Sequence, residues 1–104
     1  MAKVLHEEDF AQAVAEGKAL VEFYSDSCVP CKRMSPLLAQ LEDDGVVPVY
    51  KVNVVHSRSL AAAYKVQTTP TLLLFADGSE RARSHGYQNK AGLHAFLQEA
   101  GVVE

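Results

Sequence analysis

The two cysteines of this chain, Cys28 and Cys31, lie three positions apart in the segment Cys28-Val29-Pro30-Cys31. Residues three apart on a helical turn have Cβ atoms about 5–6 Å apart. A small local adjustment brings them within the ~3.5–4.5 Å that a disulfide requires. The spacing therefore predicts a redox site, in which one thiol attacks a disulfide and the other resolves the product.

A structural disulfide and a metal site are the other interpretations of this pair. Closing so short a loop stabilises a fold by only about 2 kcal/mol, so the pair would contribute little as a structural disulfide. A structural zinc site needs about four protein ligands, and no histidine motif supplies them here; the histidines are His6, His56, His85 and His94. Two alternatives stay open: a metal-binding module and an adaptor whose dithiol has no role.

Composition limits the class of protein and its partners. The chain has 104 residues, of which 48% are hydrophobic, so we expect a single domain over residues 1–104 with its own core. The net charge of −3 provides no basic field to attract nucleic acid or an anionic membrane. We expect a monomer without nucleic-acid or membrane partners.

The chain contains no apolar segment typical of export or of a membrane span. Residues 1–9 turn acidic after two aliphatic residues and lack a stretch of signal-peptide length. No run approaches the roughly 18 apolar residues of a transmembrane helix. We therefore expect a cytoplasmic protein, and in that compartment a lone CxxC pair is more often catalytic or metal-binding than structural.

Hydrophobic patterning predicts alternating strands and helices. Strands are predicted at residues 4–5, 19–24, 47–53, 71–76 and 80–85, and helices over residues 10–17, 28–45, 60–64 and 93–100. Pro36 should kink the second helix, and Asp77-Gly78 is typical of a hairpin turn. The order βαβαβαββα predicts an α/β fold with a mixed sheet and helices on both faces.

Several motifs, in this order, make the chain resemble the thioredoxin family over nearly its whole length. They are residues 21–24 (VEFY), residues 27–32 (SCVPCK), Pro36, residues 69–75 (TPTLLLF), Asp77-Gly78 and Gly86. The resemblance implies a thioredoxin fold with a central mixed sheet of about five strands flanked by about four helices. It also implies a thiol–disulfide oxidoreductase that reduces protein disulfides, with its dithiol at the N-terminus of the second helix.

Elementary physical chemistry favours Cys28 as the nucleophile at that location. A cysteine at a helix N-terminus faces unpaired backbone N–H groups and the positive end of the helix dipole, and both favour the thiolate. Cys31 would then resolve the mixed disulfide. Pro30 suits an early helical position, because its φ is already fixed and its missing N–H would have had no partner there.

The resemblance implies that Glu22 is a buried acid beneath the active site, where the family commonly has Asp. A buried carboxyl resists ionisation, which would suit Glu22 to exchange a proton with Cys31, through a water, during the resolving step. The alternative is a side chain that points to solvent from an edge strand. Lys51 matches a family lysine near this acid, and its own alternative is a lysine that reaches out to water.

The resemblance also implies a docking groove for clients. Thr69-Pro70 would carry a cis peptide bond and face the dithiol, and Gly86 would leave room for backbone approach. The alternatives are an ordinary turn and a simple strand break. His85 titrates near neutral pH, and a protonated imidazole there would favour the Cys28 thiolate; its alternative is an exposed, inert side chain.

The family motif Trp-Cys-Gly-Pro-Cys is altered in this chain. Ser27 replaces the tryptophan and Val29 replaces the glycine, so both the docking surface and the redox potential are expected to differ. Thr69 before the proline also occurs in isomerase-like relatives, which leaves a more oxidising function as an alternative. The resemblance implies no bound cofactor, with electrons from NADPH through a flavoprotein thioredoxin reductase, and client proteins with disulfides as the other partners.

Overall fold

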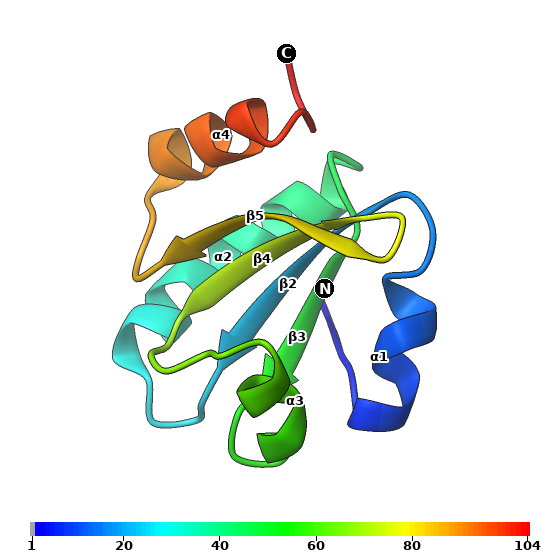
Figure 1. The fold of residues 1–104 in the computed structure, drawn as a ribbon. Coiled ribbons are helices and arrows are strands. Elements are labelled where there is room, and N and C mark those ends of the chain that lie inside the picture. The colour runs from blue at the N-terminus through cyan, green and yellow to red at the C-terminus, as the bar shows by residue number, and fades with distance from the viewer. Residues whose placement is uncertain (1) are drawn as a thin grey trace.

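The structure is a computed structural model that describes residues 2–104. Its elements follow the predicted order of strands and helices (Figure 1). In chain order they are β1 (Lys3–Val4), α1 (Glu7–Ala13), β2 (Lys18–Tyr24), α2 (Val29–Asp43), β3 (Val49–Asn53), α3 (Arg58–Ala63), β4 (Thr71–Ala76), β5 (Ser79–His85) and α4 (Lys90–Glu99).

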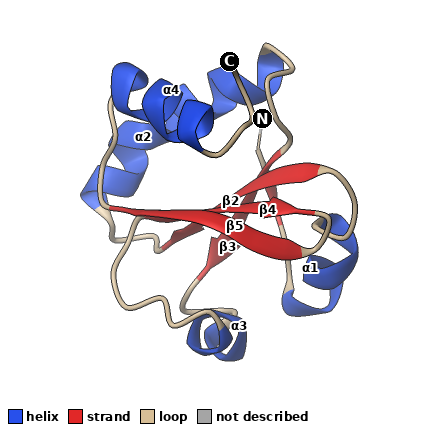
Figure 2. Ribbon diagram, turned by 45° about the horizontal axis from the view of Figure 1, so that its top comes forward, coloured by secondary structure: helices blue, strands red, loops and turns tan. Residues whose placement is uncertain are grey.

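The five strands form one mixed sheet in the order β1-β3-β2-β4-β5. The pairs β1–β3 and β2–β3 are parallel, whereas β2–β4 and β4–β5 are antiparallel. Helices α2 and α4 cover one face and α1 and α3 cover the other (Figure 2). The predicted α/β fold with a mixed sheet and helices on both faces is therefore confirmed.

Side chains of β2, the central strand, alternate between the two helical layers, as the period of two in a β-strand requires. Val21 and Phe23 belong to the core beneath α1 and α3, whereas Leu20 belongs to the core beneath α2 and α4. Glu22 lies between Val21 and Phe23, so it faces the α2 and α4 layer. The central strand thus directs one carboxyl toward the helix that carries the cysteines.

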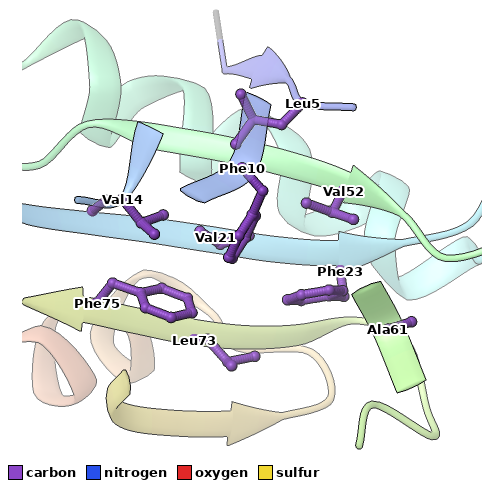
Figure 3. Packing of buried hydrophobic residues seen from close by; sticks show 10 residues of the cluster. Leu5, Phe10, Val14, Val21, Phe23, Val52, Ala61, Leu73 and Phe75 are labelled. Atoms are coloured by element: carbon purple, nitrogen blue, oxygen red, sulfur yellow. The ribbon is translucent and has the colours of Figure 1, made fainter. Parts of the chain in front are cut away.

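Aromatic rings dominate the core beneath α1 and α3 (Figure 3). The ring of Phe75 meets those of Phe10 and Tyr64 edge-on, with centroids 5.4 Å apart in each pair. Tyr64 also lies 6.3 Å from Phe23. Edge-to-face pairs of this kind add about 0.5–1.5 kcal/mol each beyond the burial of their area. This core anchors β2 and β4, the two strands that lead into and out of the site.

The predicted turn at Asp77-Gly78 joins β4 to β5, with φ of 50° and 88° at its two residues. Positive φ at both central residues is the conformation that matches the twist of a tight hairpin. The Asp77 carboxylate also accepts a hydrogen bond of 2.8 Å from the backbone N–H of Gly17, just before β2. The turn therefore aligns the hairpin with the central strand.

Several predicted element boundaries were wrong by a few residues. The strand predicted from residue 47 begins at Val49, and Pro48 before it has no N–H to pair, although its carbonyl accepts the N–H of Leu20 at 2.9 Å. The first helix ends at Ala13, earlier than the predicted Gly17. Helix α2 continues through Pro36 without a break, and a kink at that residue stays a prediction.

None of the helices within residues 2–104 is long and apolar enough to cross a membrane.

Candidate active site

Three segments of the chain meet at one end of the sheet. Strand β2 ends at Tyr24 and leads into the cysteine segment, and β4 begins at Thr71, directly after Pro70. Thr71 pairs with Phe23 of β2 on one side and with His85, the last residue of β5, on the other. The cysteine segment, the proline loop and the residues after β5 therefore lie at the same end of the sheet, as the resemblance implied.

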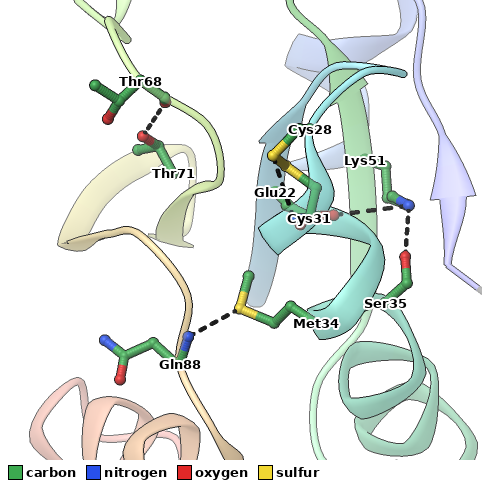
Figure 4. The surroundings of a disulfide bond; sticks show 9 residues. All are labelled: Glu22, Cys28, Cys31, Met34, Ser35, Lys51, Thr68, Thr71 and Gln88. Carbon is green, nitrogen blue, oxygen red and sulfur yellow. Dashed lines mark hydrogen bonds and ion pairs between the residues drawn. A yellow bond between two sulfur atoms is a disulfide. The ribbon is translucent and has the colours of Figure 1, made fainter.

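Cys28 and Cys31 are joined by a disulfide, with their Cα atoms 5.2 Å apart (Figure 4). Cys28 is the N-cap residue of α2, and its Sγ accepts a hydrogen bond of 3.2 Å from the backbone N–H of Cys31. Pro30 occupies the first turn of α2, where its missing N–H leaves no donor unpaired. The site thus places a sulfur at the positive end of a helix.

The two sulfurs differ in their access to solvent and in their place on the helix. Cys28 is 8% exposed and Cys31 is 3% exposed, so both are largely enclosed by protein. Cys28 precedes the helix, whereas Cys31 lies within it and belongs to the face that packs on the sheet. This asymmetry gives the first cysteine the outer position and the second the inner one.

Glu22 is completely buried, at 0% exposure, on the central strand of the sheet. The alternative of a solvent-facing acid on an edge strand is therefore excluded. In Figure 4 its side chain lies behind the first turn of α2, which carries both cysteines. Neither carboxyl oxygen has a hydrogen-bond partner among the described residues. An acid so placed is costly to ionise, because no hydrogen-bond donor among the described residues replaces the water lost on burial.

Burial raises the pKa of Glu22 to about 7, even though the positive charge of Lys51 opposes the shift. A carboxyl with a pKa near neutrality is populated in both its protonated and its ionised form. Such a group can accept and return a proton at the pH at which thiols are exchanged. The structure therefore provides an acid–base group behind the dithiol.

Lys51 supplies the charge that faces Glu22. Its Nζ lies 3.7 Å from Oε1 of Glu22, close enough for an ion pair but too far for a hydrogen bond. The ammonium donates a hydrogen bond of 3.0 Å to Oγ of Ser35 and lies 4.5 Å from the centre of the Tyr24 ring. With its side chain 19% exposed, Lys51 is directed toward the acid and not simply out to water.

The peptide bond between Thr69 and Pro70 is cis, as the resemblance implied. Pro70 is buried and Thr69 is half-buried at the start of β4. The Pro70 carbonyl accepts a hydrogen bond of 2.8 Å from the N–H of Gly86, and the Thr71 hydroxyl donates one of 2.7 Å to the Thr68 carbonyl. These bonds hold the proline loop against the segment that follows β5.

Gly86 has a φ of 84°, in the region that favours glycine, directly after β5 ends at His85. A Cβ at this position would meet no atom within 4 Å, so the space beside it is open. Nδ1 of His85 lies 3.4 Å from the Thr71 hydroxyl, and the residue is exposed. The structure thus places His85 beside the proline loop, and its influence on Cys28 stays a prediction.

The remaining candidate docking residues lie on the protein surface beside the two cysteines. Ser27, Val29 and Pro30 are all exposed, and Val29 is 64% exposed. An apolar side chain presented to solvent to this extent is available for contact with a partner. The other three histidines are exposed as well, as expected of surface residues: His6, His56 and His94.

Sequence reasoning missed four residues that shape this site. Ser35 and Tyr24 contact the Lys51 ammonium, and the signals were present: Ser35 follows Cys31 by four positions on one helix face, and Tyr24 follows Glu22 by two on one strand face. In addition, Sδ of Met34 accepts a hydrogen bond of 3.4 Å from the Gln88 N–H, which ties α2 to the segment after β5.

Residues 2–104 contain no group of three or more histidine, cysteine or acidic side chains that could hold a metal ion.

Known proteins resemble this chain in both sequence and fold. The thioredoxin family model matches residues 1–99. A thioredoxin of Chlamydia trachomatis is 38% identical over 100 residues, which span 95% of this chain and 98% of that protein. A thioredoxin of Staphylococcus aureus is 37% identical over 93 residues, covering 88% and 89% of the two chains.

The fold has a close counterpart among solved structures. Thioredoxin f2 of Chlamydomonas reinhardtii superposes with a TM-score of 0.90 over the full length of both chains, at 23% sequence identity. The cysteine pair at the start of α2, the cis proline before β4 and the matched family model agree with one another. The chain belongs to the thioredoxin family and is a thiol–disulfide oxidoreductase.

Proposed function

We propose that this protein reduces disulfides in client proteins, with Cys28 as the nucleophile and Cys31 as the resolving thiol. The observation that carries the proposal is the N-cap position of Cys28, whose Sγ accepts the Cys31 N–H at 3.2 Å. In the reduced protein this donor and the helix dipole both stabilise a thiolate on Cys28. The outer sulfur is therefore the one that attacks.

The reaction proceeds in two exchanges. The Cys28 thiolate attacks one sulfur of the client disulfide, a mixed disulfide forms, and the first client thiolate leaves. Cys31 then loses its proton and attacks Sγ of Cys28, so that the bond between Cys28 and the client breaks and the second client thiolate leaves. Two electrons pass to the client, and the protein ends with the Cys28–Cys31 disulfide.

Glu22 serves as the base for the second exchange. It is enclosed behind the first turn of α2, and its pKa of about 7 leaves both protonation states accessible. The carboxylate takes the Cys31 proton, and Lys51 favours that ionised form by its charge at 3.7 Å. The longer side chain of Glu, relative to Asp, brings the carboxyl one methylene further from the strand.

Clients dock at the end of the sheet where the cysteine segment, the proline loop and the residues after β5 meet. Thr69, Pro70 and Gly86 lie side by side along the docking groove, joined by the bond from the Gly86 N–H to the Pro70 carbonyl, and the open space beside Gly86 leaves room for an extended client backbone. Ser27, Val29 and Pro30 provide the outer contact beside Cys28, with His85 at the margin. Because Ser27 and Val29 replace a tryptophan and a glycine of the usual motif, they are proposed to select the partner reductase.

The electrons come from NADPH through a flavoprotein thioredoxin reductase, and the protein acts as a cytoplasmic monomer without a cofactor of its own. The midpoint potential of the dithiol tests the direction of transfer. Equilibration with glutathione or dithiothreitol, followed by thiol trapping, should give a midpoint potential of about −270 mV, as in reducing thioredoxins. A value near −120 mV, as in the strongest oxidants, would instead support the oxidising alternative.

The assignment of Glu22 is tested by the rate of each exchange. In Glu22→Gln, rapid-quench measurements should show mixed-disulfide formation at the parent rate and a resolving step slowed about 10²-fold, the usual scale of a lost acid–base group. Cys31→Ser provides the matched control, because it should accumulate the mixed disulfide and never resolve it. Equal resolving rates in Glu22→Gln and the parent would remove Glu22 from the mechanism.

A further inference from the structure

The Lys51 ammonium is held away from the position that a lysine normally prefers. Lysines on strands usually extend their charged end into water. Here an open cavity of ≈ 350 Å³ lies next to Lys51, between α2 and the N-terminal residues Ala2 and Val4. Ser35 and Pro36 line the same cavity, so the ammonium has solvent within reach and nevertheless lies against a buried acid.

The Lys51 ammonium donates a hydrogen bond to Ser35. Oγ of Ser35 accepts this bond at 3.0 Å, whereas Oε1 of Glu22 is at 3.7 Å and forms no hydrogen bond. The Tyr24 ring, with its centroid 4.5 Å from the ammonium, adds a cation–π contact. Figure 4 shows Ser35 and Lys51 together on the side of α2 opposite Gln88 and the Thr68 loop.

We propose that Ser35 is a positioning residue for the resolving step, which holds the Lys51 ammonium beside Glu22. The inference rests on the proposed role of Glu22 as the base that takes the Cys31 proton. The hydroxyl accepts from the ammonium and keeps it out of the cavity. The ammonium in turn favours the carboxylate, which is the form of Glu22 that can accept a proton.

The groups around Glu22 make Lys51 the charge through which Ser35 acts. From β3, Glu22 faces Lys51, with which it is in register, and from β4 it faces Leu72. Helix α2 contributes Cys28 and Cys31, which carry no charge as a disulfide. In the oxidised protein, the charge that faces Glu22 from these elements therefore comes from Lys51.

The test is the titration of the Glu22 carboxyl in oxidised protein, followed by carbon-13 NMR. In Ser35→Ala the ammonium should move into the cavity, and the pKa of Glu22 should rise by about half a unit. Alanine is a strong helix former, so α2 is expected to stay folded. Ser35→Thr keeps the hydroxyl and should restore the parent value. Ser59→Ala is the matched control, because the Ser59 hydroxyl bonds to Glu7 in a different part of the fold.

The kinetic readout follows from the same shift. If the pKa of Glu22 moves from about 7 to about 7.5, the carboxylate fraction at pH 6 falls about threefold, and the resolving rate should fall with it. At pH 9 the acid is ionised in both proteins, so the rates should be equal. A structural effect of the substitution would instead slow the step at both pH values.

An unchanged or lowered pKa of Glu22 in Ser35→Ala would overturn the proposal, and so would a loss of rate that persists at pH 9. The titration uses oxidised protein and needs no client or reductase. A raised pKa combined with a normal resolving rate in Glu22→Gln would therefore uphold the position of Lys51 and refute the catalytic role of Glu22. The two failures are thus distinguishable.

Discussion

The two faces of the sheet are built from the same strands but have different chemistry. Beneath α1 and α3 the core is mainly hydrophobic and encloses no acidic side chain among the described residues, with the rings of Phe10, Phe23 and Phe75 packed around that of Tyr64. Beneath α2 and α4 the core contains leucine and methionine side chains, but it also encloses the carboxyl of Glu22. One face only stabilises the fold, whereas the other combines stabilisation with a titratable group.

This difference shows where the protein gives up stability for function. An apolar side chain at position 22 would pack like its neighbours at no electrostatic cost. The carboxyl without a hydrogen-bond partner instead opposes folding whenever it is ionised. The aromatic core on the opposite face is the natural source of compensation, because large rings bury the most apolar area. Three substitutions test this difference between the two faces of the sheet.

The largest effect is expected from Phe75→Ala, which removes a fully buried ring from the aromatic core. The free energy of unfolding should fall by about 3–5 kcal/mol, measured by urea denaturation, because the substitution leaves a cavity. The pKa of Glu22 should stay at about 7 in the folded variant, since the acid faces the other layer. Leu74→Ala is the matched variant for both measurements, because Leu74 is the preceding residue of β4 and lies on the face of the sheet that contains Glu22.

A change in the pKa of Glu22 by more than about half a unit in Phe75→Ala would contradict this separation of the two faces. It would mean that the aromatic core also controls the environment of the acid.

An intermediate effect is expected from Glu22→Gln, and it should depend on pH. Because its pKa rises from 4.5 in the unfolded chain to about 7 in the folded protein, Glu22 holds its proton more tightly when folded. This tighter proton binding stabilises the folded state. The stabilisation is fully present below pH 4.5 and is lost as the pH rises through about 7. The variant should therefore match the parent near pH 4 and be more stable by about 3 kcal/mol at pH 8.

Urea denaturation at both pH values measures this difference. Glu8→Gln, at an exposed position of α1, controls for the loss of one negative charge. If Glu22→Gln were less stable than the parent at pH 8, then the carboxylate would be stabilised in the fold and the comparison of the two faces would fail.

The smallest effect is expected from Lys51→Met, which removes the charge that faces the acid. The pKa of Glu22 should rise further above 7, by about one unit, because the attraction that favours its carboxylate is lost. Titration of the carboxyl by NMR measures the shift. Lys90→Met, at the exposed start of α4, removes an equal charge elsewhere and should leave the pKa unchanged. Equal shifts in both variants would show that only net charge matters.

Much of the fold followed from local patterns, because its elements have strong periodicity and clear breaks. The apolar runs of β2 and β4 and the hairpin at Asp77-Gly78 were predicted with the correct type and order. The start of β3 was not, since β-branched residues before Val49 resemble a strand and only the pairing with β2 shows where it begins. Helix ends depend on tertiary contacts in the same way.

Some residues of the candidate site could also be predicted from local sequence, whereas others could not. Cys28 and Cys31 are only three positions apart, so their chemistry could be recognised without a structure. Ser35 was not recognised, because a serine on a helix is usually a surface residue and its partner, Lys51, is 16 positions away. The exposure of Val29 likewise depends on how α2 is set on the sheet.

The dithiol, the order of elements and the family could all be predicted from the sequence, because each rests on residues close together in the chain or on a pattern along it. The burial and the raised pKa of Glu22, in contrast, arise from tertiary packing. Its burial comes from β3, β4 and α2 together, and its opposing charge comes from a strand that is distant in sequence. A pKa reflects the sum of desolvation and nearby charge, and both are set when the segments pack against one another.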